Sequence, residues 1–311
     1  MQKKIVIISP GRDCTPWINA LKKEEPNLTV EVYPEDTNRA ETDFILTWNP
    51  PKNVFENYPN VKVIASMGAG IRHILKENKT PEQAEITKMD DPLLKEDMSY
   101  FVLTIALNFL RNIPLYFQQQ NDEIWERKAY KRPEDISVGI MGFGNIGIKV
   151  GELLVKNKFK VRGWSKSKKS HQHIETFAGD KELNEFLKES NILVCLLPLT
   201  NETEEILSKK IFQQLPKGAY LINVGRGPHL VEEDLKNALE REQLSGAALD
   251  VFQEEPLPKE HWFWNHKKIQ LTPHTASVTD PESISSQVIE NLNRLKKGKK
   301  LLHTVSLEKG Y

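Results

Sequence analysis

The stretch Ile136-Ser-Val-Gly-Ile-Met-Gly-Phe-Gly-Asn-Ile-Gly147 decides the fold of this chain. Its first six residues form an apolar run of the length expected for a buried strand. Glycines then recur at Gly142, Gly144 and Gly147, and a helical apolar pattern continues to about Leu154. A strand that turns through a glycine loop into a helix is typical of one unit of a parallel α/β sheet.

Short apolar runs alternate with amphipathic stretches on both sides of this unit, which predicts an α/β fold throughout. The expected strands before it are residues 5–9, 30–33, 44–48, 61–66 and 84–89. Counting residues 136–141, the second half has six expected strands, the others being residues 159–164, 191–196, 218–224, 245–251 and 268–272.

The length of 311 residues suits two domains. A helical pattern runs from Leu93 to about Gln120, and Pro114 should kink or divide it. Such a helix can join two domains. Asp280 and Pro281 suit the start of a final helix that runs to about Lys297.

The composition favours a small-molecule partner. Basic and acidic side chains balance at 43 each, so no long-range field favours nucleic acid or an anionic membrane. Only four apolar residues precede Ser9, too few for a signal peptide or a membrane span, and we expect a cytoplasmic protein. Cys14 and Cys195 cannot form a disulfide framework and are interpreted as structural thiols.

The glycine loop predicts a dinucleotide site. Gly142 permits a tight turn, Gly144 lets the backbone approach a pyrophosphate, and Gly147 lets helix and strand pack closely. About 20 residues later an NAD site usually carries an acidic residue for the ribose, but this chain reads Arg162-Gly-Trp-Ser-Lys-Ser-Lys-Lys169. A hydroxyl with several ammonium groups favours NADP over NAD, and an ordinary solvated basic loop is the alternative.

Three polar side chains follow the expected strands that end near residues 224, 251 and 272. Reduction of a 2-keto acid needs a group that holds the carboxylate and polarises the carbonyl, and the forked guanidinium of Arg226 suits this. His274 can supply a proton near neutral pH, and Glu255 can orient the ring and stabilise its charged form. Because the carboxyl ends of parallel strands share one edge, these loops are expected to meet.

Several candidates stay open on residues alone. Glu254 and Glu255 are adjacent, and only one can face the histidine. Asp250 suits either a nicotinamide contact or a structural turn. His171 and His173 lack a carboxylate or thiol at ligand spacing, so we assign no metal.

At this point the chain resembles the D-isomer-specific 2-hydroxyacid dehydrogenases, and within them the glyoxylate/hydroxypyruvate reductase A group. Besides the glycine loop and the three polar residues, the resemblance is carried by further motifs over nearly the whole chain. These are Trp48-Asn-Pro-Pro51, Ser66-Met-Gly-Ala-Gly70, Met98-Ser-Tyr-Phe-Val102, Trp164-Ser-Lys-Ser-Lys-Lys169, Phe177-Ala-Gly179, Leu196-Leu-Pro-Leu-Thr200 and Gly310-Tyr311.

The resemblance implies catalytic roles for Arg226, Glu255 and His274, and it selects Glu255 over Glu254. It implies a substrate site formed by Trp48, the backbone amides of Met67, Gly68, Ala69 and Gly70, and Arg226. It assigns coenzyme contacts to Gly142, Gly144, Asn145, Ile146, Gly147, Ser165, Lys166, Lys168, Pro198, Thr203, Val224 and Asp250. Arg72 stands where relatives often carry an aspartate, which affects the expected salt bridging behind the substrate loop.

The fold implied is two doubly wound parallel-sheet domains: a Rossmann-type coenzyme domain of residues 99–282, and a smaller flavodoxin-like substrate domain of residues 1–98 and 283–311. The active site is expected in the cleft between them. The resemblance also implies a homodimer through the coenzyme domain, with Leu115 to Trp125 in the contact.

The expected activity is NADPH-dependent reduction of glyoxylate to glycolate and of hydroxypyruvate to D-glycerate, with NAD as a possible cofactor. A broader reductase that accepts substrates such as phenylpyruvate is one alternative. Another is a dinucleotide-sensing, corepressor-like binding protein, although no regulatory tail follows the final helix.

Overall fold

The computed structural model describes residues 3–75 and 79–305. The terminal Gly310-Tyr311 motif lies outside these residues. The chain divides into two compact units. The smaller unit comprises Met1–Leu94 and Thr279–Tyr311, and the larger unit comprises Lys95–Val278.

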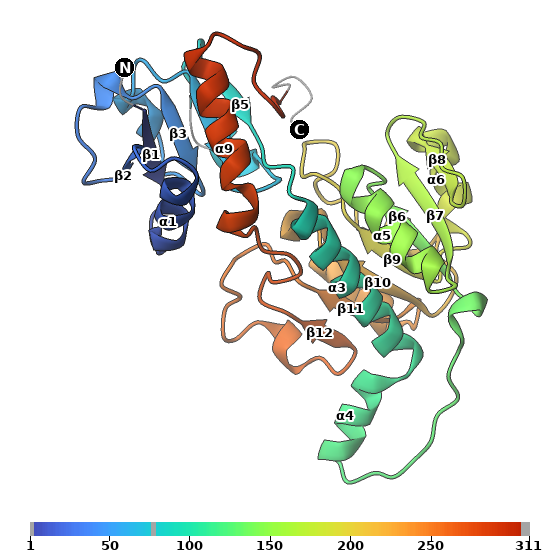
Figure 1. Cartoon of the computed structure of the whole chain (residues 1–311). Helices are drawn as coiled ribbons and strands as arrows, with labels where there is room; N and C mark the ends of the chain where they lie inside the picture. Colours follow the sequence, from blue (N-terminus) through green and yellow to red (C-terminus); the bar gives the residue numbers. More distant parts are fainter. Residues whose placement is uncertain (1–2, 76–78, 306–311) are drawn as a thin grey trace. The chain divides into compact units, whose positions relative to one another are not determined.

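The smaller unit is built on a five-stranded parallel sheet with the order β2-β1-β3-β4-β5 (Figure 1). This is the flavodoxin-like order, as expected from the sequence. The strands are β1 (Lys4–Ile8), β2 (Thr29–Val32), β3 (Phe44–Thr47), β4 (Val63–Ser66) and β5 (Glu85–Thr87).

Both faces of the smaller sheet are covered, because alternate residues of β1 pack into different cores. Ile5 and Ile7 pack with helices α1 (Thr15–Glu24) and α9 (Pro281–Lys296), whereas Val6 and Ile8 pack into a second core. The second core includes residues around α2 (Arg72–Leu75). The expected N-cap of α9 is confirmed, since the Asp280 side chain accepts a hydrogen bond from the Glu282 amide at 3.0 Å.

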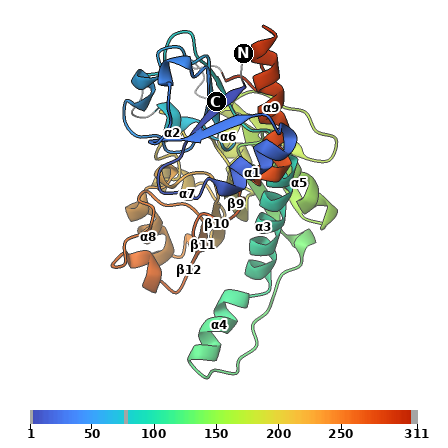
Figure 2. The ribbon, with the colours of Figure 1, turned by 60° about the vertical axis from the view of Figure 1, so that its left-hand side comes forward.

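The larger unit has seven parallel strands in the order β12-β11-β10-β9-β6-β7-β8. When β6 is numbered as the first strand, the order read from β8 is 3-2-1-4-5-6-7. This is the Rossmann order 3-2-1-4-5-6 with one further strand. The strands are β6 (Ser137–Met141), β7 (Lys160–Ser165), β8 (Glu175–Ala178), β9 (Ile192–Cys195), β10 (Ala219–Asn223), β11 (Leu244–Leu249) and β12 (Ile269–Leu271). Figure 2 shows β9 to β12 side by side.

The expectation of six strands is wrong by one, because β8 was missed. β8 has four residues, lies at the sheet edge, and buries only Phe177. An edge strand with one buried side chain lacks the continuous apolar run by which the other strands were found.

Helices cover both faces of the larger sheet. On β9, Val194 packs into the core that includes α3 (Pro92–Leu110) and α5 (Asn145–Lys156). The next residue, Cys195, packs into the opposite core with α6 (Gly179–Leu187), α7 (Lys209–Phe212) and α8 (Glu232–Glu240). The sheet is therefore doubly wound, as expected.

The division expected at Pro114 is confirmed. Helix α4 (Ile113–Asn121) follows α3 after a break, its axis is bent by 61°, and Pro114 lies in its first turn. Figures 1 and 2 show α4 extending away from the sheet of the larger unit. Within the described residues no single helix has the length and hydropathy of a membrane span, and only the bent pair α3 and α4 meets both criteria together.

Candidate active site

The loops that follow β10, β11 and β12 carry the three predicted catalytic side chains. His274 Nδ1 lies 2.7 Å from Glu255 Oε2, and Glu255 Oε1 accepts a hydrogen bond from the Phe252 amide at 3.0 Å. Each side chain of the pair is 35% exposed. The carboxylate is thus fixed by its own loop on one side and faces the imidazole on the other.

The charges of this cluster influence one another. Burial opposes ionisation of Glu255, but hydrogen bonds from His274 and Phe252, with the charges of His274 and Arg226, lower the pKa of the carboxyl below its usual value. Burial lowers the pKa of the Arg226 guanidinium, and the charge of Glu255 opposes that shift. The structure therefore brings all three predicted residues into one interacting group.

Asp250 holds the loop that carries His274. The carboxylate is buried and accepts hydrogen bonds from the Thr272 hydroxyl at 2.6 Å and from the amides of Thr275 and Ala276 at 2.8 and 3.0 Å. The Asp250 carbonyl accepts the His274 amide at 2.9 Å. These contacts fix His274 in a left-handed backbone conformation, with φ of 51°.

The glycine loop after β6 has the shape of a phosphate cradle. Gly142 has φ of 109°, and a Cβ there would lie 2.6 Å from the backbone of Leu196. A Cβ on Gly147 would lie 2.3 Å from the Gly142 oxygen, whereas one on Gly144 would meet nothing within 4 Å. Asn145 and Ile146 begin α5, whose first amides face the loop end as a dinucleotide phosphate requires.

The predicted basic loop follows β7, and two of its lysines, Lys166 and Lys168, are paired with carboxylates. Lys166 Nζ lies 2.7 and 2.5 Å from the two carboxylate oxygens of Glu202. Lys168 Nζ lies 3.0 Å from Glu182, and the Ser165 hydroxyl donates to the Ser167 carbonyl at 2.8 Å. The residues could still hold a phosphate, but the phosphate would have to displace these carboxylates.

The other predicted coenzyme contacts lie beyond the ends of β9 and β10. The Thr203 hydroxyl donates to the Pro198 carbonyl at 2.6 Å and accepts the Thr200 amide at 2.8 Å, which closes the loop after β9. Val224 is buried, and its amide donates to the Cys195 carbonyl at 3.3 Å. The structure therefore brings Pro198 and Thr203 together at the same edge of the sheet as the glycine loop.

In the smaller unit, the loop after β4 uses two of its four predicted amides internally. The Met67 amide donates to the Thr47 carbonyl at 2.9 Å, and the Gly68 amide donates to the Ser66 hydroxyl at 3.2 Å. Within residues 3–75 and 79–305, the amides of Ala69 and Gly70 have no hydrogen-bond acceptor.

Trp48 lies beside this loop. A Cβ on Gly68 would meet the indole at 2.8 Å, and the ring centroid lies 4.3 Å from that of His73. The guanidinium of Arg12 lies 5.0 Å from the indole centroid. Trp48 is therefore packed among Gly68, His73 and Arg12 in the smaller unit.

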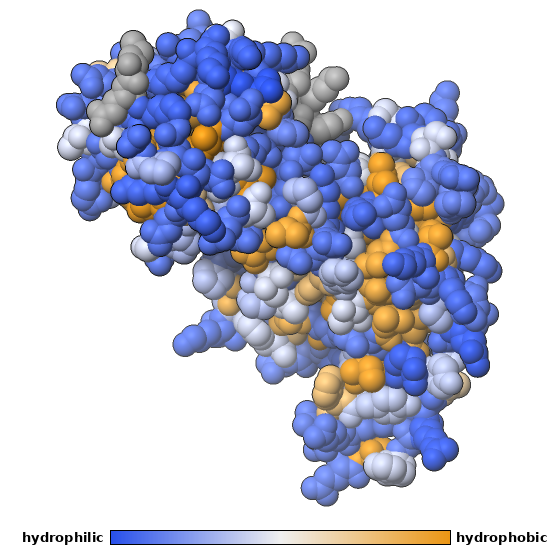
Figure 3. Space-filling view, in the orientation of Figure 1, coloured by the Kyte–Doolittle hydropathy of each residue, from blue (hydrophilic) through white to orange (hydrophobic). Residues whose placement is uncertain are grey.

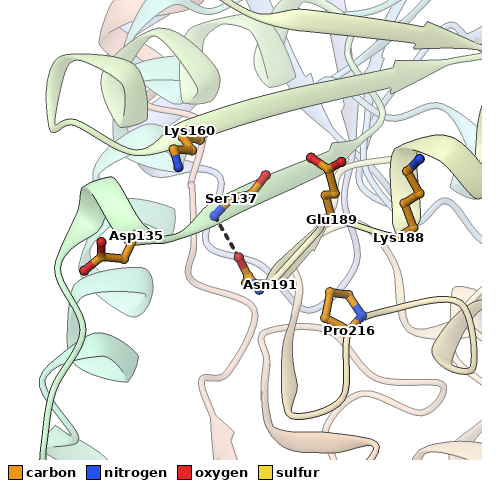
Figure 4. A pocket seen from close by; sticks show the side chains of 7 residues that line it. All are labelled: Asp135, Ser137, Lys160, Lys188, Glu189, Asn191 and Pro216. Carbon is orange, nitrogen blue, oxygen red and sulfur yellow. Dashed lines mark hydrogen bonds between the residues drawn. The ribbon is translucent and has the colours of Figure 1, made fainter.

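A pocket of about 310 Å³ lies at the opposite edge of the larger sheet (Figure 4). It surrounds the amino ends of the strands, where the Ser137 amide donates to the Asn191 side chain at 3.0 Å. Its lining is Asp135, Ser137, Lys160, Lys188, Glu189, Asn191 and Pro216. Ligands of open α/β sheets bind at the carboxyl ends, so this pocket is not the candidate active site. In the described part of the chain, no cluster of His, Cys, Asp and Glu could hold a metal ion.

Two residues of this region were not singled out from the sequence. Glu202 is the carboxylate that pairs with Lys166, and His229 is a buried histidine that contacts the turn containing Arg226. A histidine three residues after a predicted catalytic arginine was a usable signal for the second. No sequence signal marked Glu202, because its contact with Lys166 spans 36 residues.

Comparison with known proteins gives the family. Residues 103–276 match the family described as "D-isomer specific 2-hydroxyacid dehydrogenase, NAD binding domain". The chain belongs to this family. It is therefore an NAD(P)-dependent oxidoreductase, and the resemblance stated from the sequence is confirmed.

Relatives of this dehydrogenase cover the whole chain. The chain is 34% identical to the glyoxylate/hydroxypyruvate reductase A of Photorhabdus laumondii, over 99% of this chain and 100% of that protein. It is 36% identical to the protein of the same name from Escherichia fergusonii, over 99% of each chain.

Solved structures agree with this assignment. A D-isomer specific 2-hydroxyacid dehydrogenase from Xanthobacter autotrophicus Py2, in complex with NADPH and MES, superposes with a TM-score of 0.95 at 32% identity over 100% of both chains. An NADPH-dependent glyoxylate/hydroxypyruvate reductase from Sinorhizobium meliloti, in complex with NADP and sulfate, gives 0.93 at 30% identity, over 99% of this chain and 100% of that chain.

Proposed function

We propose that this dehydrogenase reduces small 2-keto acids with NADPH, converting glyoxylate to glycolate and hydroxypyruvate to D-glycerate. The observation that carries the proposal is the contact of His274 with Glu255 at 2.7 Å, in a cluster that also includes Arg226. The relatives named glyoxylate/hydroxypyruvate reductase support the choice of substrates.

Each residue of the cluster has a separate task. Bound nicotinamide coenzyme supplies the hydride. Arg226 binds the substrate carboxylate through its fork of donors and polarises the carbonyl. His274 gives its proton to the carbonyl oxygen as that oxygen becomes a hydroxyl, and Glu255 orients the ring and stabilises its charged form before transfer.

The test is His274→Ala with glyoxylate and hydroxypyruvate. Loss of a general acid should lower kcat by about a hundredfold or more, while the Kd for NADPH stays close to that of the parent. His303→Ala is a matched control, since His303 lies in the smaller unit and is assigned no role. Parent-like turnover by His274→Ala would remove this residue from the mechanism.

We propose NADPH as the preferred cofactor and NADH as the weaker one. The glycine loop fits a dinucleotide phosphate, and Ser165, Lys166 and Lys168 supply a hydroxyl and two cations for a 2′-phosphate. The neighbouring structures with NADPH or NADP support this choice. The ratio of kcat/KM for the two cofactors, measured at one ionic strength, tests it.

We propose that the smaller unit binds the substrate through the amides of Ala69 and Gly70, with Trp48 as a wall of that site. Met67 and Gly68 are less suited as donors because their amides are engaged within the unit. In a panel of 2-keto acids, Trp48→Ala should raise kcat/KM for bulky substrates such as phenylpyruvate relative to that for glyoxylate. An unchanged ranking would exclude Trp48 from the pocket.

We further propose a homodimer that uses α4 and the segment after it. Figure 3 shows apolar side chains over this part of the larger unit, and Trp125 is 97% exposed. Sedimentation should give a dimer for the parent and a shift toward monomer for Trp125→Glu, whereas the exposed Trp264→Glu should stay dimeric.

The cytoplasmic location stays a prediction.

A further inference from the structure

A buried histidine lies directly behind the turn that contains Arg226. His229 is 0% exposed and ends the short 3-10 turn Gly227–His229, which follows β10. Its Nδ1 accepts the backbone amide of Arg226 at 3.0 Å, and its Nε2 lies 3.3 Å from the Pro198 carbonyl oxygen. Both ring nitrogens are therefore directed at backbone groups of loops that carry predicted site residues.

These contacts define the hydrogen-bonding state of the ring. Nδ1 must present a lone pair to the Arg226 amide, so the proton of the neutral ring is on Nε2 and is donated to Pro198. In a doubly protonated ring, the N–H group at Nδ1 would face the backbone N–H group of Arg226, and neither could accept a hydrogen bond. The Cys195 thiol, 3.8 Å from Nδ1, adds only a weak donor on the same side.

Close packing leaves the turn little freedom. A Cβ on Gly225 would lie 3.0 Å from His229 Nδ1, and a Cβ on Gly227 would lie 1.9 Å from the Phe252 carbonyl carbon. Gly225, which precedes Arg226, therefore packs against the imidazole. Gly227, which follows Arg226, packs against the loop that holds Glu255. The Arg226 backbone is extended between them, with φ of −145° and ψ of 151°.

We propose that His229 is a positioning residue, which holds the Arg226 backbone at the angle that directs the guanidinium to substrate and ties that turn to the Pro198 loop. This inference rests on the proposed function of Arg226. Without the ring, the Arg226 amide loses its acceptor, the Pro198 carbonyl keeps only the Thr203 hydroxyl as a donor, and a cavity opens behind Gly225. A displacement of about 1 Å in a substrate-binding group can cost about a hundredfold in rate.

The side chains of Asn and Gln separate the two hydrogen bonds. In His229→Asn the side-chain oxygen occupies the place of Nδ1 and can accept the Arg226 amide, but it cannot reach Pro198. In His229→Gln the amide nitrogen can reach Pro198, and the acceptor for Arg226 is lost. His229→Ala removes both.

The experiment measures kcat and KM for glyoxylate, the Kd for NADPH, and the Kd of the NADPH-bound protein for oxalate, an unreactive analogue of a 2-keto acid. We expect His229→Ala and His229→Gln to lose about tenfold to a hundredfold in kcat/KM and to bind oxalate more weakly. His229→Asn should recover most of both. The Kd for NADPH should change by less than about threefold in all three, because the Pro198 carbonyl keeps its hydrogen bond from the Thr203 hydroxyl.

His261→Ala is the matched control. The His261 ring also caps a 3-10 turn of the larger unit, accepting the Phe263 amide at 3.3 Å, and its other nitrogen lies 3.0 Å from Glu232. We expect His261→Ala to lower Tm, as we also expect of His229→Ala. Unlike His229→Ala, it should leave kcat/KM and oxalate binding near parent values.

The inference is overturned if His229→Ala loses no more activity than His261→Ala, or if His229→Asn is as poor as His229→Gln. The Asn and Gln pair decides the matter even if the alanine variant does not fold. A parent protein without turnover of any 2-keto acid would overturn the proposed function and this inference together. An active parent with a fully active His229→Ala would overturn the inference alone.

Discussion

Glu202 is expected to weaken NADPH binding, because its carboxylate holds the Lys166 ammonium that we assign to the 2′-phosphate. The Lys166 side chain is 68% exposed and that of Glu202 is 69% exposed. Phosphate binding must break this pair and then tolerate a carboxylate nearby. Glu202→Gln keeps the shape of the side chain and removes the charge, so NADPH should bind the variant more tightly.

The size of the effect follows from the exposure of the pair. Exposed ion pairs contribute about 0.2 to 1 kcal/mol, and about 1.4 kcal/mol corresponds to a tenfold change in affinity. The Kd for NADPH should therefore fall by about 1.4-fold to fivefold. The Kd for NADH should not change, because NADH has no 2′-phosphate to compete for Lys166.

The assay is titration of each cofactor, followed by nicotinamide fluorescence, at about 0.15 M salt and again at higher salt, where screening should shrink the difference. Adding Lys166→Ala should abolish the gain. The control is Glu185→Gln, which breaks an exposed pair of 2.6 Å with Lys188, a residue of the pocket at the opposite sheet edge. Equal gains for NADH and NADPH, or no gain for either, would refute the assignment of Lys166.

Three further outcomes are expected. Ser165→Asp should reverse the cofactor preference, measured as kcat/KM for NADPH and NADH, because a carboxylate repels the 2′-phosphate and accepts from a ribose hydroxyl. Gly227→Ala should destabilise the fold by about 1 to 3 kcal/mol in urea unfolding, since its Cβ would overlap the Phe252 backbone, whereas Gly144→Ala should unfold like the parent. Because folding lowers the pKa of Glu255, its carboxylate contributes stability that is complete above its usual pKa and is lost as pH falls through the lowered value. Glu255→Gln should therefore make Tm less dependent on pH in acid, and a parent-like acid profile would contradict this.

The sequence was most informative where local chemistry determines the backbone. Continuous apolar runs located the buried strands, the glycine spacing located the turn into α5, and Asp280 with Pro281 located the start of α9. Each signal comes from neighbouring residues, so it can be recognised without knowledge of tertiary contacts. The edge strand β8 escaped because it buries only one side chain.

Pairing partners distant in sequence could not be predicted. The lysines after β7 suggested an open cationic site, but the structure places Lys166 against Glu202 and Lys168 against Glu182. The four backbone amides of residues 67–70, predicted as substrate donors, are likewise not equally available. The Met67 amide continues the hydrogen bonding of β4 to the neighbouring strand β3. Such contacts depend on how the strands are ordered in the sheet, which no short motif encodes.

The loop that carries His274 should behave in hydrogen exchange as part of the sheet. Its amides at Thr275 and Ala276 donate to the buried Asp250 carboxylate, and the His274 amide donates to the Asp250 carbonyl. Such protons exchange only when their acceptor moves away, and Asp250 directly follows β11, with its own amide bonded to the Asn223 carbonyl at the end of β10. The segment around the proposed proton donor therefore opens together with two central strands, as one cooperative unit rather than as an independent surface loop.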